Sequence, residues 1–407
     1  MKSFRIGSLF GIPIKLDLTF LLILPIFAYL IGAQLEPVAE ILNELMGAGI
    51  VIAPLTEGTT PWILGLVAAI GLFVGVLLHE LGHSLVAQRY GFPIDSITLW
   101  LFGGIAALSE MPEDWRKEFN IAIAGPIVSI LVGVVTYGLF LLTPVLEGVA
   151  PTTVLNGTLF VLAYLAFLNV ALAIFNMLPA FPMDGGRVLR ALLARNQSYT
   201  RATQQAAGIG KFFAVLMGIF GLFTFNIILI GIAVFVYIAA SSEAQQVVIK
   251  AAFTDVTVSD IMTAAPDLDT VSPDTTVAEL VQRMFSERHT GYPVVEDGRL
   301  VGLVTLDDAQ QIQPVERDAH HVEDVMTTEL ETVAPNADAM DALERMQRER
   351  IGRLLVVDDA EGEKLQGDPT ENGDLVGLIT RTDVMTALNI IQQSGAVEPM
   401  QSSQPAD

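Results

Sequence analysis

The chain has 407 residues, of which 52% are hydrophobic and only 16% are charged. Soluble domains carry about a quarter of their residues as charges, so this composition excludes an ordinary soluble protein. The absence of cysteine excludes disulfides, thiol catalysis and thiolate metal sites.

The formal net charge of −23 is unevenly distributed along the chain. Residues 1–250 carry 12 Lys and Arg against 14 Asp and Glu, whereas residues 251–407 carry 10 against 31. The first part therefore has the composition of a membrane protein and the second that of an acidic soluble region. Acidity of this size argues against binding to nucleic acid, whose phosphates need positive charge.

Apolar runs in the first 250 residues predict six membrane spans, since a helical span needs about 20 residues. A basic stretch precedes the first run, but no cleavage site follows it, so we expect an uncleaved helix. The last run is too long for one span and is expected to form two short ones, with a turn near Phe225. The runs are Leu18–Ala33, Pro61–Gln88, Phe119–Leu142, Thr153–Met177 and Lys211–Ala240.

Basic residues predict the orientation of these spans. With a cytoplasmic N-terminus, the outer segments are Gln34–Thr60, Leu142–Pro151 and the turn near Phe225, and they contain no Lys or Arg. All 12 basic residues of this half then lie inside, as the positive-inside rule expects. The prediction is a multi-pass protein of the cell membrane, in contact with lipid, with both termini in the cytoplasm.

The second predicted span contains an HExxH motif, formed by His79, Glu80 and His83. Residues four apart lie on the same face of a helix, so both imidazoles can bind one zinc ion. Glu80 then points toward the water that zinc activates. Ionisable residues inside a span are costly and usually functional. The alternative is a helix that tolerates two neutral histidines facing other helices.

Asp184 is the most suitable third ligand in the membrane half. It follows the fourth predicted span in the segment Asn176–Gly186, where two prolines and two glycines interrupt the helix. Irregular backbone at membrane depth survives only where it is buried in protein or lines a wet cavity. Such a break lets Asp184 turn toward the second span. The alternative is that Asp184 caps a helix just outside the membrane.

The HExxH motif and the NxxPxxPxDGG segment together resemble the site-2 protease family of intramembrane zinc metalloproteases, over Gly7–Glu243. The resemblance implies one zinc per chain, bound by His79, His83 and Asp184, with Glu80 as the catalytic acid and base. It also implies that the substrates are transmembrane proteins, which are cut by regulated intramembrane proteolysis.

Three further features bear on this resemblance. Asn176 matches the family's motif, which implies a role in positioning substrate. Gly125-Pro126 also matches, but Ser129 stands where many relatives carry Asn, so its role stays open. The β-rich stretch Phe92–Glu110 resembles a family segment that dips into the membrane beside the active site, where its edge would pair with an extended substrate. The alternative is an amphipathic surface loop.

The acidic half contains an internal repeat. Val258–Thr263 recurs as Val322–Thr327, and Val301–Thr305 recurs as Val376–Thr380. The second copy is longer by an acidic insertion, Asp359–Asp374. Each copy predicts a strand, an amphipathic helix, two hydrophobic strands and a final helix.

This repeat resembles a tandem pair of CBS domains. The resemblance implies a paired α/β module whose clefts often bind adenine nucleotides. The Thr-x-x-Asp motif of that family appears as Thr305 to Asp308 and as Thr380 to Asp383, and these four residues are the candidate nucleotide ligands. The alternative is a pair that binds nothing and only joins two chains into a homodimer.

The predicted architecture is therefore a polytopic α-helical membrane domain followed by a cytoplasmic α/β CBS pair. The expected domains are residues 1–250, 251–316 and 317–394, with a disordered tail at 395–407. The leading hypothesis is an intramembrane zinc endopeptidase regulated by the CBS pair. The alternatives are a transporter or channel with the same module and a metal-free scaffold; a transporter would need broken spans in both halves.

Overall fold

The structure is a computed structural model that describes residues 3–100, 103–108, 112–358 and 374–394. The chain forms two compact units, residues 1–247 and 248–407. The disordered tail expected at 395–407 and nearly all of the acidic insertion lie outside the described residues.

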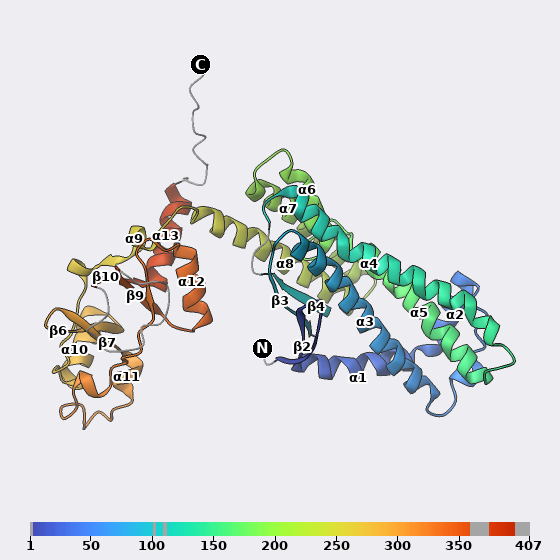
Figure 1. Cartoon of the computed structure of the whole chain (residues 1–407), viewed down its shortest axis with the longest axis horizontal. Helices are drawn as coiled ribbons and strands as arrows, with labels where there is room; N and C mark the ends of the chain where they lie inside the picture. Colours follow the sequence, from blue (N-terminus) through green and yellow to red (C-terminus); the bar gives the residue numbers. More distant parts are fainter. Residues whose placement is uncertain (1–2, 101–102, 109–111, 359–373, 395–407) are drawn as a thin grey trace, which may run out of the picture. The chain divides into compact units, whose positions relative to one another are not determined.

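The first unit is mostly helical, as expected (Figure 1). Among the described residues, five helices are long and apolar enough to cross a membrane, and α1 with α2, bent by 67° at their junction, makes a sixth candidate. The helices are α1 (Leu18–Ala33), α2 (Leu35–Met46), α3 (Thr60–Arg89), α4 (Trp115–Leu142), α5 (Thr152–Asn176), α6 (Asp184–Ala194), α7 (Tyr199–Phe223) and α8 (Ile227–Ala252).

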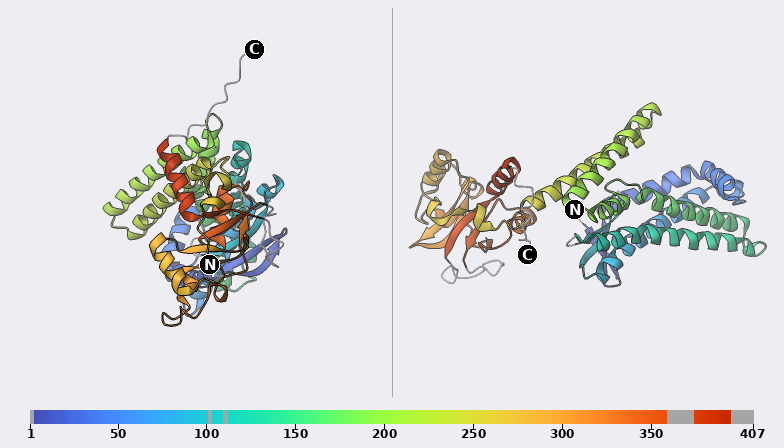
Figure 2. Two further views of the ribbon diagram at one scale, coloured as in Figure 1. Left: turned by 90° about the vertical axis from the view of Figure 1, so that its left-hand side faces the viewer. Right: turned by 90° about the horizontal axis from the view of Figure 1, so that it is seen from above.

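Two details of the helical pattern differ from the expectation. The run Leu35–Met46, assigned to an outer loop, is the helix α2, which buries Leu35, Ala39 and Leu42 on one face. The last two spans are not short, because α7 and α8 continue into polar sequence and reach 25 and 26 residues. The turn between them falls at Phe225, as predicted, and the two helices run side by side (Figure 2).

Small residues let the helices of the first unit approach closely. A Cβ atom on Gly65 of α3 would lie 2.2 Å from the backbone oxygen of Ala28 in α1. A Cβ atom on Gly82 would lie 3.0 Å from the backbone oxygen of Ala124 in α4. Membrane helices associate through such contacts because lipid provides no hydrophobic driving force between them.

A four-stranded sheet lies alongside α3 (Figure 1). Its order is β1 (Ser3–Leu9), β2 (Ile12–Asp17), β3 (Ile94–Trp100), β4 (Gly103–Leu108). β2 and β3 are parallel, and the other neighbours are antiparallel. The strands expected in the 92–110 stretch are β3 and β4, whereas the N-terminal hairpin β1–β2 was not expected, because its basic residues suggested only the start of a span.

The second unit contains the two predicted repeats. In the first, the elements are α9 (Val258–Ile261), β5 (Thr263–Ala264), α10 (Val277–Glu287), β6 (Gly291–Glu296), β7 (Arg299–Thr305) and α11 (Leu306–Gln310). In the second, they are β8 (Thr332–Val333), α12 (Ala339–Arg348), β9 (Arg353–Val357), β10 (Leu375–Thr380) and α13 (Arg381–Ser394). Short 3-10 turns occur at Ala53–Leu55, Thr143–Leu146, Ala265–Asp267 and Val322–Asp324.

The repeats exchange their first segments. β5 of the first repeat pairs with β10 of the second, and Thr327 of the second repeat bridges to Leu303 in β7 of the first. A Cβ atom on Gly377 would lie 2.5 Å from the sulfur of Met262, and one on Gly302 would lie 2.6 Å from the sulfur of Met326. The recurring Met-Thr pair of each repeat thus packs against the recurring Val-Gly pair of the other repeat. The same contact therefore occurs twice.

Candidate active site

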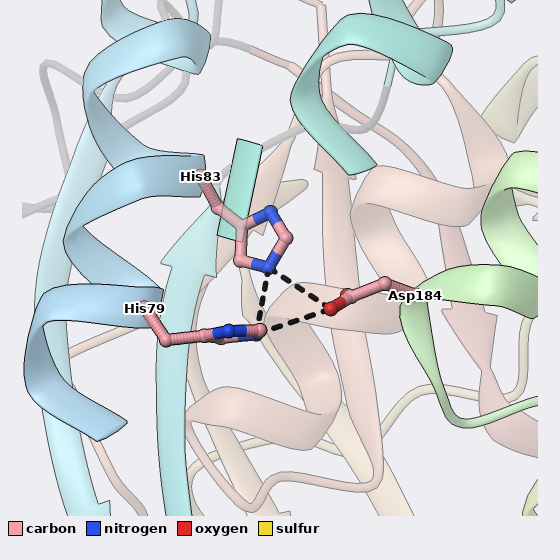
Figure 3. Close-up of side chains that lie close together, drawn as sticks. All are labelled: His79, His83 and Asp184. Atoms are coloured by element: carbon pink, nitrogen blue, oxygen red, sulfur yellow. Dashed lines mark hydrogen bonds and ion pairs between the residues drawn. The ribbon is translucent and has the colours of Figure 1, made fainter. Parts of the chain in front are cut away.

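The candidate metal ligands lie together inside the first unit (Figure 3). His79 and His83 lie one turn apart on α3, and Asp184 is the first residue of α6. The Oδ2 atom of Asp184 lies 3.1 Å from Nε2 of His79 and 3.2 Å from Nε2 of His83. The two Nε2 atoms are 3.2 Å apart. All three side chains are buried.

These distances fit three ligands of a single zinc ion. Zinc binds His nitrogen and carboxylate oxygen at about 2.0–2.2 Å, so two tetrahedral ligand atoms lie about 3.3 Å apart. The three atoms form a triangle of nearly that size, with sides of 3.1, 3.2 and 3.2 Å. Three protein ligands leave the fourth tetrahedral position open, as a catalytic site requires.

In both imidazoles Nδ1 has a partner outside the triangle, and this leaves Nε2 as the candidate ligand atom. Nδ1 of His83 lies 2.7 Å from the backbone oxygen of Ile121. A carbonyl oxygen only accepts hydrogen bonds, so Nδ1 carries the proton, and in the neutral ring Nε2 keeps its lone pair for a metal. Nδ1 of His79 lies 2.9 Å from Oγ of Ser129, which is fully buried. Ser129, whose role the sequence left open, therefore contacts a candidate ligand.

Asp184 reaches the histidines because the helical backbone is interrupted between α5 and α6, over residues 177–183, which we call the break. The break contains a cis peptide bond between Phe181 and Pro182. A Cβ atom on Gly185 would lie 2.3 Å from the backbone oxygen of Leu178, and one on Gly186 would lie 2.7 Å from backbone atoms of Ala180. Only glycine permits this approach, so the two glycines let α6 begin directly against the break. Asp184 is 8% exposed, and its carboxylate faces the two histidines.

Glu80 lies close to the backbone of strand β4. Its side chain is half-buried, and a Cβ atom on Gly104 would lie 2.4 Å from its Cγ atom. Gly104 therefore lets the strand pass directly over the candidate base. Gly125 has the same role for a ligand, because a Cβ atom there would lie 2.2 Å from Nε2 of His83. Neither constraint is visible in the sequence, since the pattern does not say which atoms a glycine faces.

Asn176, the predicted substrate-positioning residue, also borders the triangle. It is the last residue of α5, and its Nδ2 atom lies 3.4 Å from Nε2 of His79. The Asn176 side chain is half-buried.

The candidate nucleotide residues form helix caps in both repeats. Oδ2 of Asp308 accepts hydrogen bonds from Oγ1 and the backbone nitrogen of Thr305, at 2.6 and 2.8 Å. Asp383 and Thr380 repeat this arrangement, with both distances 2.8 Å. Each motif is therefore a capping box that fixes the start of α11 or α13. This structural role was not predicted, and it occupies one carboxylate oxygen of each aspartate.

Two buried imidazoles and a carboxylate around one point, beside a glutamate on a membrane-spanning helix, define a membrane metallohydrolase. Comparison with known proteins makes the class specific. The sequence profile of peptidase family M50 matches residues 67–218, and that of the CBS domain matches residues 258–312 and 322–367.

Individual proteins are also similar to this chain. A zinc metalloprotease of Methanocaldococcus jannaschii is 35% identical over 391 residues, which are 96% of this chain and 97% of that protein. The solved structure of the site-2 protease from the same organism is 38% identical, with a TM-score of 0.40, and covers 60% of this chain and 95% of that one. The structure of CBSX2 in complex with AMP is 29% identical, with a TM-score of 0.27, and covers 33% of this chain and 98% of that one.

The chain belongs to peptidase family M50, the site-2 proteases, and carries a tandem CBS pair. It is an intramembrane zinc metalloendopeptidase, and its substrates are transmembrane proteins. The hypothesis of a zinc protease is thereby confirmed, and the transporter or channel alternative is set aside.

Proposed function

We propose that His79, His83 and Asp184 hold one zinc ion per chain and that Glu80 is the catalytic acid and base. The observation that carries this proposal is the triangle formed by Nε2 of His79, Nε2 of His83 and Oδ2 of Asp184. Its sides are 3.1–3.2 Å, and all three side chains are buried. Its size and its ligand types suit zinc.

The chain's own groups then have distinct tasks. Zinc, when bound, polarises the scissile carbonyl and lowers the pKa of water to about 7. Glu80 takes a proton from the attacking water and returns it to the leaving amine nitrogen. Ser129 and the backbone oxygen of Ile121 hold the two imidazoles in orientation. The amide of Asn176, which lies 3.4 Å from Nε2 of His79, would donate a hydrogen bond to the substrate's carbonyl oxygen.

We propose that the substrate is unwound and pairs with β4. Among the described residues, β4 has a strand partner, β3, on one side only. β3 is paired on both sides, so an added strand would pair with β4 rather than with β3. A helix hides its peptide bonds in internal hydrogen bonds, whereas an added strand presents them in extended form. Gly104 would bring that strand close to Glu80.

The test is cleavage of a transmembrane model substrate by the purified full-length chain in proteoliposomes. Glu80→Gln should retain zinc but lower kcat by about 10²- to 10⁴-fold, the usual contribution of general acid–base catalysis. Glu113→Gln, at an exposed position, is the matched control and should cleave normally. Full activity of Glu80→Gln would exclude the proposed role.

We also propose that both termini are cytoplasmic, as the distribution of basic residues supports. The natural chain lacks cysteine, so single cysteines report sidedness without background. In intact cells, a membrane-impermeant maleimide should label Glu57→Cys in the predicted outer segment but not Asp297→Cys in the second unit. Labelling in the opposite pattern would reverse the orientation.

We propose that the CBS pair binds an adenine nucleotide and joins two chains into a homodimer. One oxygen of Asp308 and of Asp383 is engaged in its capping box, which leaves Oδ1 of each for ribose hydroxyls. Arg353 is a candidate phosphate contact; its Nη2 atom donates to Oγ1 of Thr290 at 2.9 Å, and burial lowers its pKa. The domain limits at residues 250, 316 and 394 stay predictions.

Thermal unfolding of the full chain with AMP, ADP and ATP tests the nucleotide. Ligand at 100 times Kd stabilises the native state by about 2.7 kcal/mol, which is measurable as a shift in Tm. The shift should disappear in an Arg353→Gln variant. No shift with any nucleotide at millimolar concentration would exclude the proposal. Light scattering of the detergent-solubilised chain separates monomer from dimer.

A further inference from the structure

A buried arginine on α6 contacts three other helices, α4, α7 and α8, and the break that precedes Asp184. Arg190 on α6 is fully buried. Its Nε and Nη2 atoms lie 2.7 and 2.6 Å from Oε1 of Glu118 on α4. Its Nη1 atom donates to Oε1 of Glu243 on α8 at 2.6 Å. The guanidinium also lies 4.9 Å from the ring centre of Phe181 and 4.8 Å from that of Tyr199.

Burying this cluster of charges costs more free energy than burying apolar side chains of the same volume. Burying charges carries a large desolvation penalty, and well-packed apolar residues of similar volume often stabilise a protein as well or better. A guanidinium group bonded to two carboxylates does, however, fix the relative positions of the helices that carry them, because its hydrogen bonds have defined directions. The cluster is therefore better explained by the position it imposes on α6 than by stability alone.

The position of α6 matters because this helix begins with Asp184. Arg190 lies six residues later, about 9 Å along a rigid helix. The start of α6 is held by the contacts of Gly185 and Gly186 with the break, and Arg190 holds the same helix further along. A rotation or slide of α6 would displace the carboxylate from the two imidazoles.

The partner on α4 connects the cluster to the other side of the metal triangle. Glu118 lies three residues, about one helical turn, before Ile121, whose backbone oxygen faces Nδ1 of His83 at 2.7 Å. One turn of α4 thus contacts both Arg190 and His83. This turn relates the helix that carries Asp184 to the helix that carries the histidines.

We propose that Arg190 is a positioning residue for the metal centre, which it serves by fixing α6 against Glu118 and Glu243. This inference rests on the proposed role of Asp184 as a ligand. It adds that the geometry of the centre depends on α8 through Glu243, although α8 contributes no ligand atom to the triangle.

The experiment uses the full-length chain, loaded with Co²⁺ as a spectroscopic probe or with Zn²⁺ alone. The visible spectrum of bound Co²⁺ reports ligand geometry, and transfer of Zn²⁺ to a chelator reports the rate of metal loss. We expect Arg190→Met to alter the Co²⁺ spectrum and to speed zinc loss by about 10- to 100-fold, the range for residues that orient metal ligands. Arg190→Lys keeps the charge without the fork and should restore part of both signals.

Two further variants keep the test decisive. Glu243→Gln, at a carboxylate that is 30% exposed, should fold even where Arg190→Met does not, and should change the spectrum in the same direction by a smaller amount. Arg201→Gln, at an exposed position of α7, is the matched control and should leave spectrum and rate unchanged. A purely structural role would lower Tm without altering the spectrum of the folded variants.

The outcomes separate this inference from the proposed function. If Asp184→Asn binds zinc and cleaves normally, the proposed ligand set fails. If Asp184→Asn loses zinc while folded Arg190 and Glu243 variants keep the wild-type spectrum and rate of zinc loss, the ligand set stands and the positioning role of Arg190 is overturned.

Discussion

The two units use several of their carboxylates differently. In the first unit acids are few, and two of the buried ones, Glu118 and Asp184, contact histidine or arginine side chains, whereas the buried Asp17 caps α1. In the second unit acids are many, and aspartates such as Asp260, Asp308 and Asp383 cap their own helices with single oxygens. A carboxylate buried in the membrane part needs a partner that repays its desolvation, so its presence indicates a task. A carboxylate in water needs none.

One substitution made in both units tests this contrast and has the largest expected effect. Asp184→Asn removes a charged ligand and should lower both zinc content and kcat/KM by more than about 100-fold, beyond the usual cost of losing a ligand's hydrogen-bond partner. Asp260→Asn, in the second unit, keeps an oxygen that accepts in the capping box of α9, so zinc and activity should stay normal. Metal analysis and cleavage assays on both purified variants decide the comparison. Equal losses in the two variants would show that the contrast is wrong.

A second change probes how closely the sheet approaches the catalytic glutamate. Gly104→Val would place side-chain atoms where the Cγ of Glu80 lies, since even a Cβ atom would approach it to 2.4 Å. Displacing a catalytic group by about 1 Å costs about 10²-fold in rate, so kcat should fall by that factor while zinc content is kept. Gly138→Val, where a Cβ atom meets nothing within 4 Å, is the control for a glycine-to-valine change in this unit. Normal kcat in Gly104→Val would mean that β4 is not fixed over Glu80.

The sequence was enough to predict the candidate ligands but not what surrounds them. His79 and His83 could be paired because helical spacing alone puts them on one face, and Asp184 because prolines and glycines interrupt the helix beside it. Contacts between distant segments carry no such local signal. Ser129 lies 50 residues from His79, and Arg190 lies 72 residues from Glu118, so neither pair could be found without the fold.

The elements that the sequence missed have physical reasons too. β1 and β2 contain basic and apolar residues next to a hydrophobic run, and only their pairing with β3 makes them a sheet. The exchange of strands between the repeats was also invisible, because each repeat read alone looks self-sufficient. The helices and repeats, by contrast, were predictable, since hydrophobic length and internal similarity are properties of the sequence itself.

Ser129→Ala is the third test, and it asks whether a neutral hydroxyl in the membrane part also contributes to metal binding. Its loss leaves Nδ1 of His79 without the contact at 2.9 Å, and zinc affinity should fall by about 10- to 100-fold. Competition with a chelator measures the affinity. Thr136→Val on the same helix removes a hydroxyl that bonds only to the backbone of its own helix, so its zinc affinity should match the wild type. Unchanged affinity in Ser129→Ala would leave His79 oriented by other contacts.

The smallest effect is expected in the second unit, where the half-buried carboxylate of Glu287 stabilises the fold in a pH-dependent way. The hydroxyl of Tyr292 donates to Glu287 at 2.6 Å, and with Arg283 it lowers the pKa of Glu287 below the usual 4.5. A lowered folded-state pKa means that the stabilisation is present above the unfolded-state pKa and is lost as the pH falls through the folded-state value. The protection factors of the α10 amides, which correct for the slower intrinsic exchange in acid, should therefore fall more steeply between pH 6 and pH 3 in the wild type than in Glu287→Gln. Parallel pH profiles would show that this contact is too exposed to matter.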